Sequence, residues 1–160
     1  MAARLRQDLP PLQVDLATMT GNVAQVFVTD AEWAATLRAT YVTLRPGGRL
    51  LFETRDPAAK AWLEWNRERS YTRTVVAGVG AVQAWVELLD VNGQLVSFRS
   101  TFVFEADGAV LTSDSTLRFR HQDEVIASLA AAGYLIDEVR QAPDRPGREL
   151  VFIARRAGVG

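Results

Sequence analysis

The stretch VDLATMTGNVAQVFVTDAEWAATLRATYVTLRPGGRLLFETRDP, residues 14–57, determines the fold class of this chain. It opens with a short β-like run, residues 14–19, which the turn-forming Thr20-Gly21-Asn22 interrupts. Near its end, Leu50-Leu51-Phe52 is apolar without alternation, which is typical of a strand that is covered on both faces. Two strands are therefore predicted, and the segment between them decides how they connect.

That segment carries the pattern of an amphipathic helix. Thr29 is a good N-cap, and Glu32 three residues later completes a capping box. One helical face collects apolar residues at spacings of four, four and three, namely Trp33, Leu37, Tyr41 and Leu44. The sequence Pro46-Gly47-Gly48 is expected to end the helix. Strand, helix and strand in this spacing predict a βαβ unit with a right-handed crossover.

A second helix is expected to begin at Asp56-Pro57, with Asp as N-cap and Pro in the first turn. It is predicted to reach about Asn66 and to carry Trp62 and Trp65. Large aromatic side chains bury much apolar area, so we expect these residues to fill a core or an interface.

Residues 71–120 change to a β pattern, and we predict four antiparallel strands there. Asn92-Gly93 favours a type I′ hairpin, and Ala106-Asp107-Gly108 marks another turn. The third strand alternates. One face holds Val96, Phe98, Ser100, Phe102 and Phe104, and the other holds Leu95, Ser97, Arg99 and Thr101. This alternation is typical of a sheet with one face in water.

The C-terminal part returns to a helix, at about residues 122–132, with Val125, Ile126 and Leu129 inward and Gly133 as its stop. Strands follow at 134–141 and 150–154, around a turn that carries Pro and Gly. The chain is therefore predicted to be α/β. We expect one domain over residues 1–160, with a four-stranded antiparallel insertion at 71–120 between α/β parts at 14–66 and 121–156.

Composition limits the possible partners. The chain has 160 residues, a net charge of −1 and no cysteine, so disulfides and thiolate metal sites are excluded. Nucleic acid and anionic membranes are not expected as partners, because both usually require a surplus of Lys and Arg. The sequence has no apolar run near 18 residues, no signal-peptide core and no metal-binding motif. We therefore predict a cytoplasmic protein without a metal site.

The order of these elements resembles the C-terminal half of the Rossmann-like fold of class I S-adenosylmethionine (SAM) dependent methyltransferases. The similarity is greatest to the glycine N-methyltransferase type, which has a Leu-Gly-Asn-Ser loop after its fourth strand. Here that loop reads Thr20-Gly21-Asn22-Val23, and the acidic residue and Arg after the fifth strand are Glu53 and Arg55. The resemblance covers about residues 14–155. It implies a partial Rossmann-like sheet, consisting of the last parallel strands and an antiparallel final strand.

The resemblance also implies a site. Thr20 and Gly21 would contact SAM, while Asn22, Gln25 and Arg55 would bind a small-molecule substrate, and no catalytic residue is assigned. Each role competes with a structural one. Gly21 permits a sharp turn, Asn22 can hold its own turn, and Arg55 can pair with Asp56 or Glu53.

Two further residues are weaker candidates for catalysis. Glu53 suits a base or a supporting role, and His121, the single histidine, suits helix capping at least as well as proton transfer.

Members of the family bind SAM mainly through a G-x-G-x-G loop after the first strand, which this sequence lacks. We therefore expect the chain to be a C-terminal portion that is inactive alone. We also expect a homodimer, formed across the edge of the first strand or through the antiparallel insertion. Two alternatives stay open. One is a non-catalytic dimeric or ligand-binding domain derived from a methyltransferase, and the other is an unrelated α+β binding domain.

Overall fold

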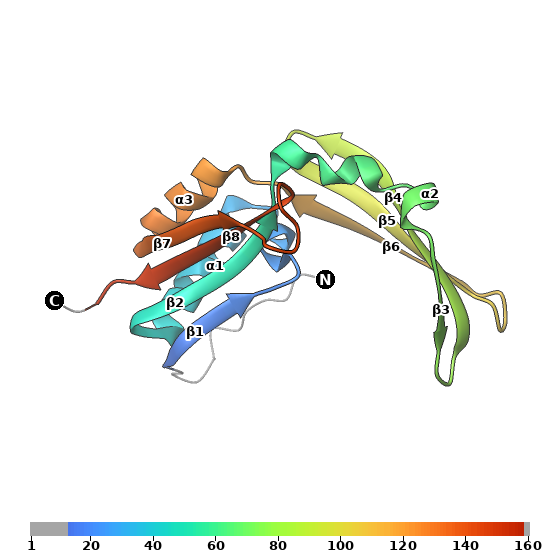
Figure 1. Ribbon diagram of the computed structural model, residues 1–160, viewed down its shortest axis with the longest axis horizontal. Helices are drawn as coiled ribbons and strands as arrows, with labels where there is room; N and C mark the ends of the chain where they lie inside the picture. Colours follow the sequence, from blue (N-terminus) through green and yellow to red (C-terminus); the bar gives the residue numbers. More distant parts are fainter. Residues whose placement is uncertain (1–12, 159–160) are drawn as a thin grey trace. The chain divides into compact units, whose positions relative to one another are not determined.

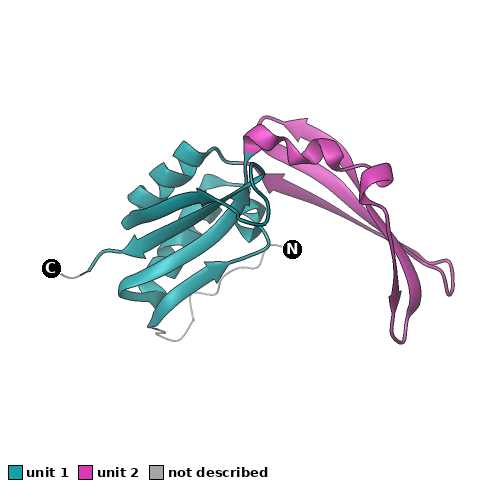
Figure 2. Cartoon of the chain, in the orientation of Figure 1, with its two compact units in different colours: residues 1–56, 120–160 teal, residues 57–119 magenta. Residues whose placement is uncertain are grey.

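The computed structural model describes residues 13–158 and divides into two compact units. Unit 1 comprises residues 1–56 and 120–160, and unit 2 comprises residues 57–119 (Figure 2). Residues 1–12, where no signal-peptide core was expected, lie outside the described residues. No helix between residues 13 and 158 has the length and apolar character needed to cross a bilayer.

Unit 1 is built on a four-stranded mixed sheet (Figure 1). Its order is β1 (Val14–Met19), β2 (Leu44–Arg55), β8 (Glu149–Arg156) and β7 (Tyr134–Gln141). β1 and β2 are parallel, whereas β8 runs antiparallel to both β2 and β7. This arrangement confirms the predicted α/β class and the antiparallel final strand.

Two helices belong to this sheet. α1 (Asp30–Thr43) begins with the predicted capping box, in which the Thr29 hydroxyl accepts from the Glu32 amide at 3.1 Å. α3 (Gln122–Ala131) ends just before Gly133, which adopts a φ of 91°. The Trp33 Nε1–H donates to Ser128 Oγ at 2.8 Å and so links the two helices.

The core of unit 1 lies between these helices and one face of the sheet. Leu37 on α1 and Leu129 on α3 are fully buried. Phe52 on β2 stacks on Phe152 on β8, with ring centroids 5.1 Å apart, and meets Trp33 edge-on at 5.5 Å. The predicted apolar helix face therefore packs on the sheet, as expected from its spacing.

The opposite face of β2 differs from the prediction. Leu50 and Phe52 are fully buried, but Leu51 between them is only partly buried. The residues of β2 and β8 in the main core cluster have even numbers, which places them on the face that the helices cover, while Val151 on the other face of β8 is 7% exposed. The prediction that the Leu50-Leu51-Phe52 strand is covered on both faces is thus wrong for the described part of the chain.

The end of α1 also differs from the prediction. The helix stops at Thr43, and Leu44 is already extended and paired with Val14, so the helix ends before Pro46. The glycines instead permit close approach of two strands. A Cβ on Gly48 would lie 3.1 Å from the Val14 carbonyl oxygen and 2.9 Å from that of Arg45, so no larger residue fits without a shift.

Unit 2 begins with three short helical turns in place of the single helix predicted from Asp56 to Asn66. These are η2 (Pro57–Ala59), η3 (Ala61–Glu64) and α2 (Arg67–Ser70). The cause of the break is Lys60, which has a φ of 45° in the left-handed region and cannot continue a right-handed helix.

The four predicted antiparallel strands of unit 2 are confirmed. In order across the sheet they are β3 (Thr72–Val76), β4 (Gly80–Asn92), β5 (Leu95–Phe104) and β6 (Val110–Arg118). Figure 1 shows them as a long twisted ribbon.

The turn between β4 and β5 was predicted one residue too early and with the wrong type. Asn92 pairs with Leu95, so the two central residues are Gly93 and Gln94. Of these only Gly93 has a positive φ, 58°. Positive φ at the first central position alone fits a type II′ turn, whereas type I′ requires it at both.

The two faces of the unit 2 sheet differ sharply in charge. Strand register places Arg73, Glu87, Arg99, Glu105 and Asp114 on one face. The other face carries Phe98, Phe102 and Leu111, and none of the described strand residues on it is charged. The predicted alternation is therefore confirmed, although Phe102 on the apolar face is 39% exposed and Thr101 on the charged face is buried.

The tryptophans of unit 2 pack where large aromatic residues were expected. Trp62 meets Phe119 edge-on with ring centroids 4.7 Å apart, and Trp65 meets Phe98 at 4.8 Å. Phe119 is 1% exposed, so this cluster forms the dense part of unit 2.

The charged face predicts a specific acid titration. Arg73 donates to both carboxylate oxygens of Glu105, at 2.8 and 2.6 Å, and Gln83 donates at 2.9 Å. These bonds, with that from Arg73 first, lower the pKa of Glu105 to about 2. Because the folded pKa is depressed, the stabilising contribution is complete above the unfolded pKa. It is lost as the pH falls towards 2.

We expect an NMR titration of the Glu105 carboxyl carbon to show this low midpoint. Arg73→Gln should return the midpoint towards the usual range of a glutamate. Arg99→Gln removes the equivalent bidentate pair with Asp114 and should leave Glu105 unchanged. An ordinary midpoint in the unmodified protein would contradict this assignment.

Candidate functional site

The candidate site lies in unit 1, where the parallel strands β1 and β2 end. Residues 20–25, here called the site loop, leave the end of β1, and Arg55 is the last residue of β2. The carboxyl ends of parallel strands in α/β sheets are the usual position of ligand sites. The loop is held in shape by Gly21 and Asn22, both in the left-handed region, with φ of 69° and 60°.

Asn22 is a buried amide in a conformation that few residues tolerate. Its side chain is 3% exposed, and its Nδ2 donates to Glu149 Oε1 at 3.0 Å. Asparagine enters the left-handed region more readily than most residues. The bond to Glu149 shows that Asn22 does more than hold its own turn, because its partner lies 127 residues away.

Gln25 is the second buried amide, and it is 1% exposed. Its Oε1 accepts a hydrogen bond from Arg55 Nη1 at 2.9 Å. Burial lowers the pKa of Arg55, and the negative charge of Glu149 opposes that shift. The structure thus brings together three residues that the sequence predicted to bind substrate: Asn22, Gln25 and Arg55.

Glu149 joins these groups and was missed from the sequence. It is 5% exposed, begins β8, and lies opposite Arg55 in the register of β2 and β8. Its Oε1 also accepts from Arg145 Nη1 at 2.7 Å. In the sequence, the only signal is that Glu149 stands immediately before the apolar run Leu150–Ala154. This signal is not sufficient, because the pairing of β8 with β2 is what brings Glu149 to the site.

Glu53 lies on the opposite face of β2 from Phe52 and supports the site loop. Its Oε1 accepts from the Gly21 amide at 2.7 Å. Gly21 itself is exposed, and a Cβ added there would meet nothing within 4 Å. Thr20 is also exposed. The two residues predicted to contact SAM therefore border open space.

The buried amides have one unsatisfied atom each. Among the described residues, Asn22 Oδ1 and Gln25 Nε2 are buried without a hydrogen-bond partner. A buried polar atom left unpaired costs about 1–3 kcal/mol. Such atoms are uncommon in native proteins, and a ligand that pairs them would recover this energy.

Charges of both signs surround the amides. Arg55 and Arg145 provide two positive charges, and Glu53, Glu149 and Asp144 provide three negative charges that act on them. The cluster therefore has no surplus of positive charge that would favour an anionic ligand.

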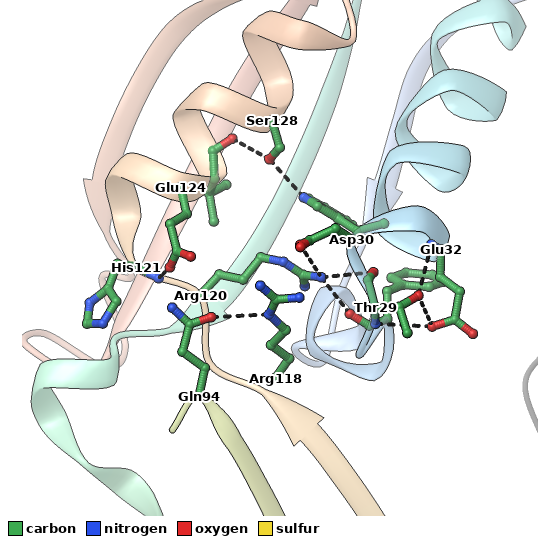
Figure 3. A network of polar contacts seen from close by, with 12 residues as sticks. Thr29, Asp30, Glu32, Gln94, Arg118, Arg120, His121, Glu124 and Ser128 are labelled. Atoms are coloured by element: carbon green, nitrogen blue, oxygen red, sulfur yellow. Dashed lines mark hydrogen bonds and ion pairs between the residues drawn. The ribbon is translucent and has the colours of Figure 1, made fainter. Parts of the chain in front are cut away.

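His121 lies at the start of α3, where it serves as the N-cap residue (Figure 3). Its backbone N–H donates to Glu124 Oε2 at 2.8 Å. This is the capping position that the sequence suggested. Its neighbour Arg120 is 5% exposed and donates to the carbonyl oxygens of Phe27 and Thr29, at 2.8 and 3.2 Å, just after the site loop.

Comparison with known proteins bears on the fold. No family model matches the sequence. No curated protein matches it either. Among solved structures, a SAM-dependent methyltransferase from Clostridium acetobutylicum superposes with a TM-score of 0.70 at 13% identity, over 94% of this chain and 61% of that one. The described chain has the fold of a methyltransferase.

Two other solved structures have a similar fold. The methyltransferase CcbJ from Streptomyces caelestis has a TM-score of 0.69 at 18% identity, over 96% of this chain and 61% of its own. The sugar N-methyltransferase KedS8 from Streptoalloteichus has a TM-score of 0.70 at 22% identity, over 91% of this chain and 57% of its own. The chain thus spans about three fifths of the length of these methyltransferases.

Proposed function

We propose that this chain takes part in SAM-dependent methylation of a small molecule and supplies the side of the site that binds the methyl acceptor. The observation that carries the proposal is the cluster of Asn22, Gln25 and Arg55 at the carboxyl ends of β1 and β2. The methyltransferase fold and the sugar substrate named for one structural neighbour support it.

Thr20 and Gly21 are proposed to contact SAM. When bound, SAM would supply a methyl group on a sulfonium. The residues present fit such a contact, because both are exposed and a Cβ on Gly21 would meet nothing within 4 Å. The chain's own contribution is to bind and orient, since methyl transfer depends chiefly on placing donor and acceptor in line.

We expect S-adenosylhomocysteine, the demethylated form of SAM, to bind the purified chain detectably but weakly in calorimetry, because the sequence lacks the glycine-rich loop that makes most of the family's contacts with SAM. Gly21→Val should weaken this binding about tenfold or more, since a branched side chain would fill the open space beside the loop. Gly108→Val is a matched control. Gly108 also has a positive φ and open surroundings, but it lies in a turn of unit 2. We expect Gly108→Val to leave the affinity unchanged.

A failure to bind SAM would favour a second candidate function, that of a non-catalytic binding domain. Absence of binding at millimolar SAM and S-adenosylhomocysteine would favour a non-catalytic domain that binds another small ligand or a second copy of itself. The uncharged face of the unit 2 sheet favours this candidate, because Phe102 and Leu111 are 39% and 59% exposed on it.

We also propose that the chain forms a homodimer. β1 is an edge strand among the described residues, with Leu16 55% exposed, and the apolar face of unit 2 is a second candidate interface. Light scattering at micromolar concentration should give twice the monomer mass. Phe102→Asp should produce monomers if the unit 2 face is used, and Leu16→Asp should do so if the edge is used. A monomer in the unmodified protein would contradict the proposal.

A further inference from the structure

The two buried amides of the site are fixed in opposite orientations. The Nδ2 of Asn22 is engaged by Glu149, so its remaining atom is an acceptor, Oδ1. The Oε1 of Gln25 is engaged by Arg55, so its remaining atom is a donor, Nε2. In the described part of the chain neither remaining atom has a partner, and both are buried. The site therefore presents one acceptor and one donor.

The donor and acceptor roles of the groups that fix these amides cannot be exchanged. The Oε1 of Glu149 accepts from Arg145 as well as from Asn22, and a carboxylate oxygen cannot donate to Asn22 Oδ1. Arg55 carries only donors, so it cannot accept from Gln25 Nε2. Rotating either amide by half a turn would put two donors or two acceptors face to face.

We propose that Glu149 is a positioning residue which, with Arg55, makes the site selective for a neutral group that both donates and accepts, such as a hydroxyl or an uncharged amine. The ligand would donate to Asn22 Oδ1 and accept from Gln25 Nε2. A carboxylate has nothing to donate to Asn22, and the charged groups around the amides include no surplus of positive charge that would attract it. That this ligand is the methyl acceptor rests on the proposed function.

Entry to the buried atoms requires side-chain movement close to the surface. Arg145 is 54% exposed and is joined to Asn22 through Glu149. Arg55, the partner of Gln25, is partly buried at the end of β2. Both are long side chains with several rotatable bonds, and we infer that their rearrangement admits the ligand.

The test uses the ¹⁵N-labelled full chain without SAM. The side-chain amide NMR signals of Asn22 and Gln25 are followed during titration with ethylene glycol, 1,2-dimethoxyethane or acetate. The first two share a skeleton, but only ethylene glycol can donate. We expect ethylene glycol to shift both signals and to bind about fivefold or more tightly than dimethoxyethane, with acetate no better than the ether.

The variant Glu149→Gln tests the positioning role. A glutamine can donate or accept, so it no longer fixes Asn22, and we expect the preference for ethylene glycol to fall to within about twofold. Glu138→Gln makes the same change on exposed β7 and should keep the full preference. If Glu149→Gln does not fold, Glu149→Asp, which keeps the charge but draws the oxygens back by one methylene, gives the same readout.

Three outcomes would overturn the inference. The first is that acetate or dimethoxyethane matches ethylene glycol in the unmodified protein. The second is that Glu149→Gln keeps the full preference, and the third is that neither amide signal responds to any probe. A purely structural role of Glu149 would lower stability without changing the ratio of the two affinities. SAM is absent from this experiment, so the inference and the proposed function can fail separately. If the chain prefers ethylene glycol but binds no S-adenosylhomocysteine, the methyltransferase proposal is rejected and the inference about Glu149 stands.

Discussion

Phe52→Ala is expected to lower the free energy of unfolding by about 3–5 kcal/mol, which is a large part of the stability of a domain of this size. Phe52 is fully buried and contacts Phe152 and Trp33, with centroids at 5.1 and 5.5 Å. Removing the ring leaves a cavity between sheet and helices that the neighbouring aromatic rings cannot fill without leaving their own contacts. Chemical denaturation followed by circular dichroism would measure the change.

Leu63→Ala is the control for this substitution. Leu63 is 65% exposed and lies in neither candidate dimer interface, so truncating its side chain should cost about 1 kcal/mol or less. Equal losses from both variants would contradict the assignment of Phe52 to the centre of the core.

Arg120→Met is expected to lower the free energy of unfolding by about 2–4 kcal/mol. The methionine keeps most of the aliphatic stem but removes a donor for the carbonyl oxygens of Phe27 and Thr29. Figure 3 shows Arg120 beside Thr29. It also removes the cation above Trp33, where the guanidinium carbon lies 5.4 Å from the ring centroid. The Phe27 carbonyl would lose this donor, whereas the Thr29 carbonyl would keep the backbone N–H of Trp33, at 3.2 Å.

The matched control is Arg38→Met, on the exposed side of α1, which should change stability by less than about 0.5 kcal/mol. Denaturation of both variants under the same conditions would compare them. A neutral effect of Arg120→Met would show that its burial offsets its hydrogen bonds, as happens for some buried ions.

Local signals in the sequence predicted most elements of the fold. The capping box at Thr29, the spacing of Trp33 and Leu37, and the alternation in β5 each depend on residues close together in the chain. The errors arose where backbone conformation was decided by less characteristic residues. Lys60 in the left-handed region is an example, because lysine has no particular preference for it.

The candidate site was predictable only in part, for the same reason. Gly21 and Asn22 follow β1, and Arg55 ends β2, and the order of these strands could be inferred from the βαβ pattern. Glu149 could not be assigned, since its role depends on the register in which β8 pairs with β2. The orientation of the two amides likewise follows from partners that are 30 and 127 residues distant.

The hydrogen bond between Asn22 and Glu149 has a consequence for how the chain folds. It joins the first strand-to-helix connection to the first residue of the last strand, across 127 positions. Contacts of such long range form late, because a large loop must close before they are made. During synthesis the site loop would therefore emerge long before Glu149. The site could bind its ligand only after the C-terminal strand has joined the sheet. Ligand binding would then report that folding is complete.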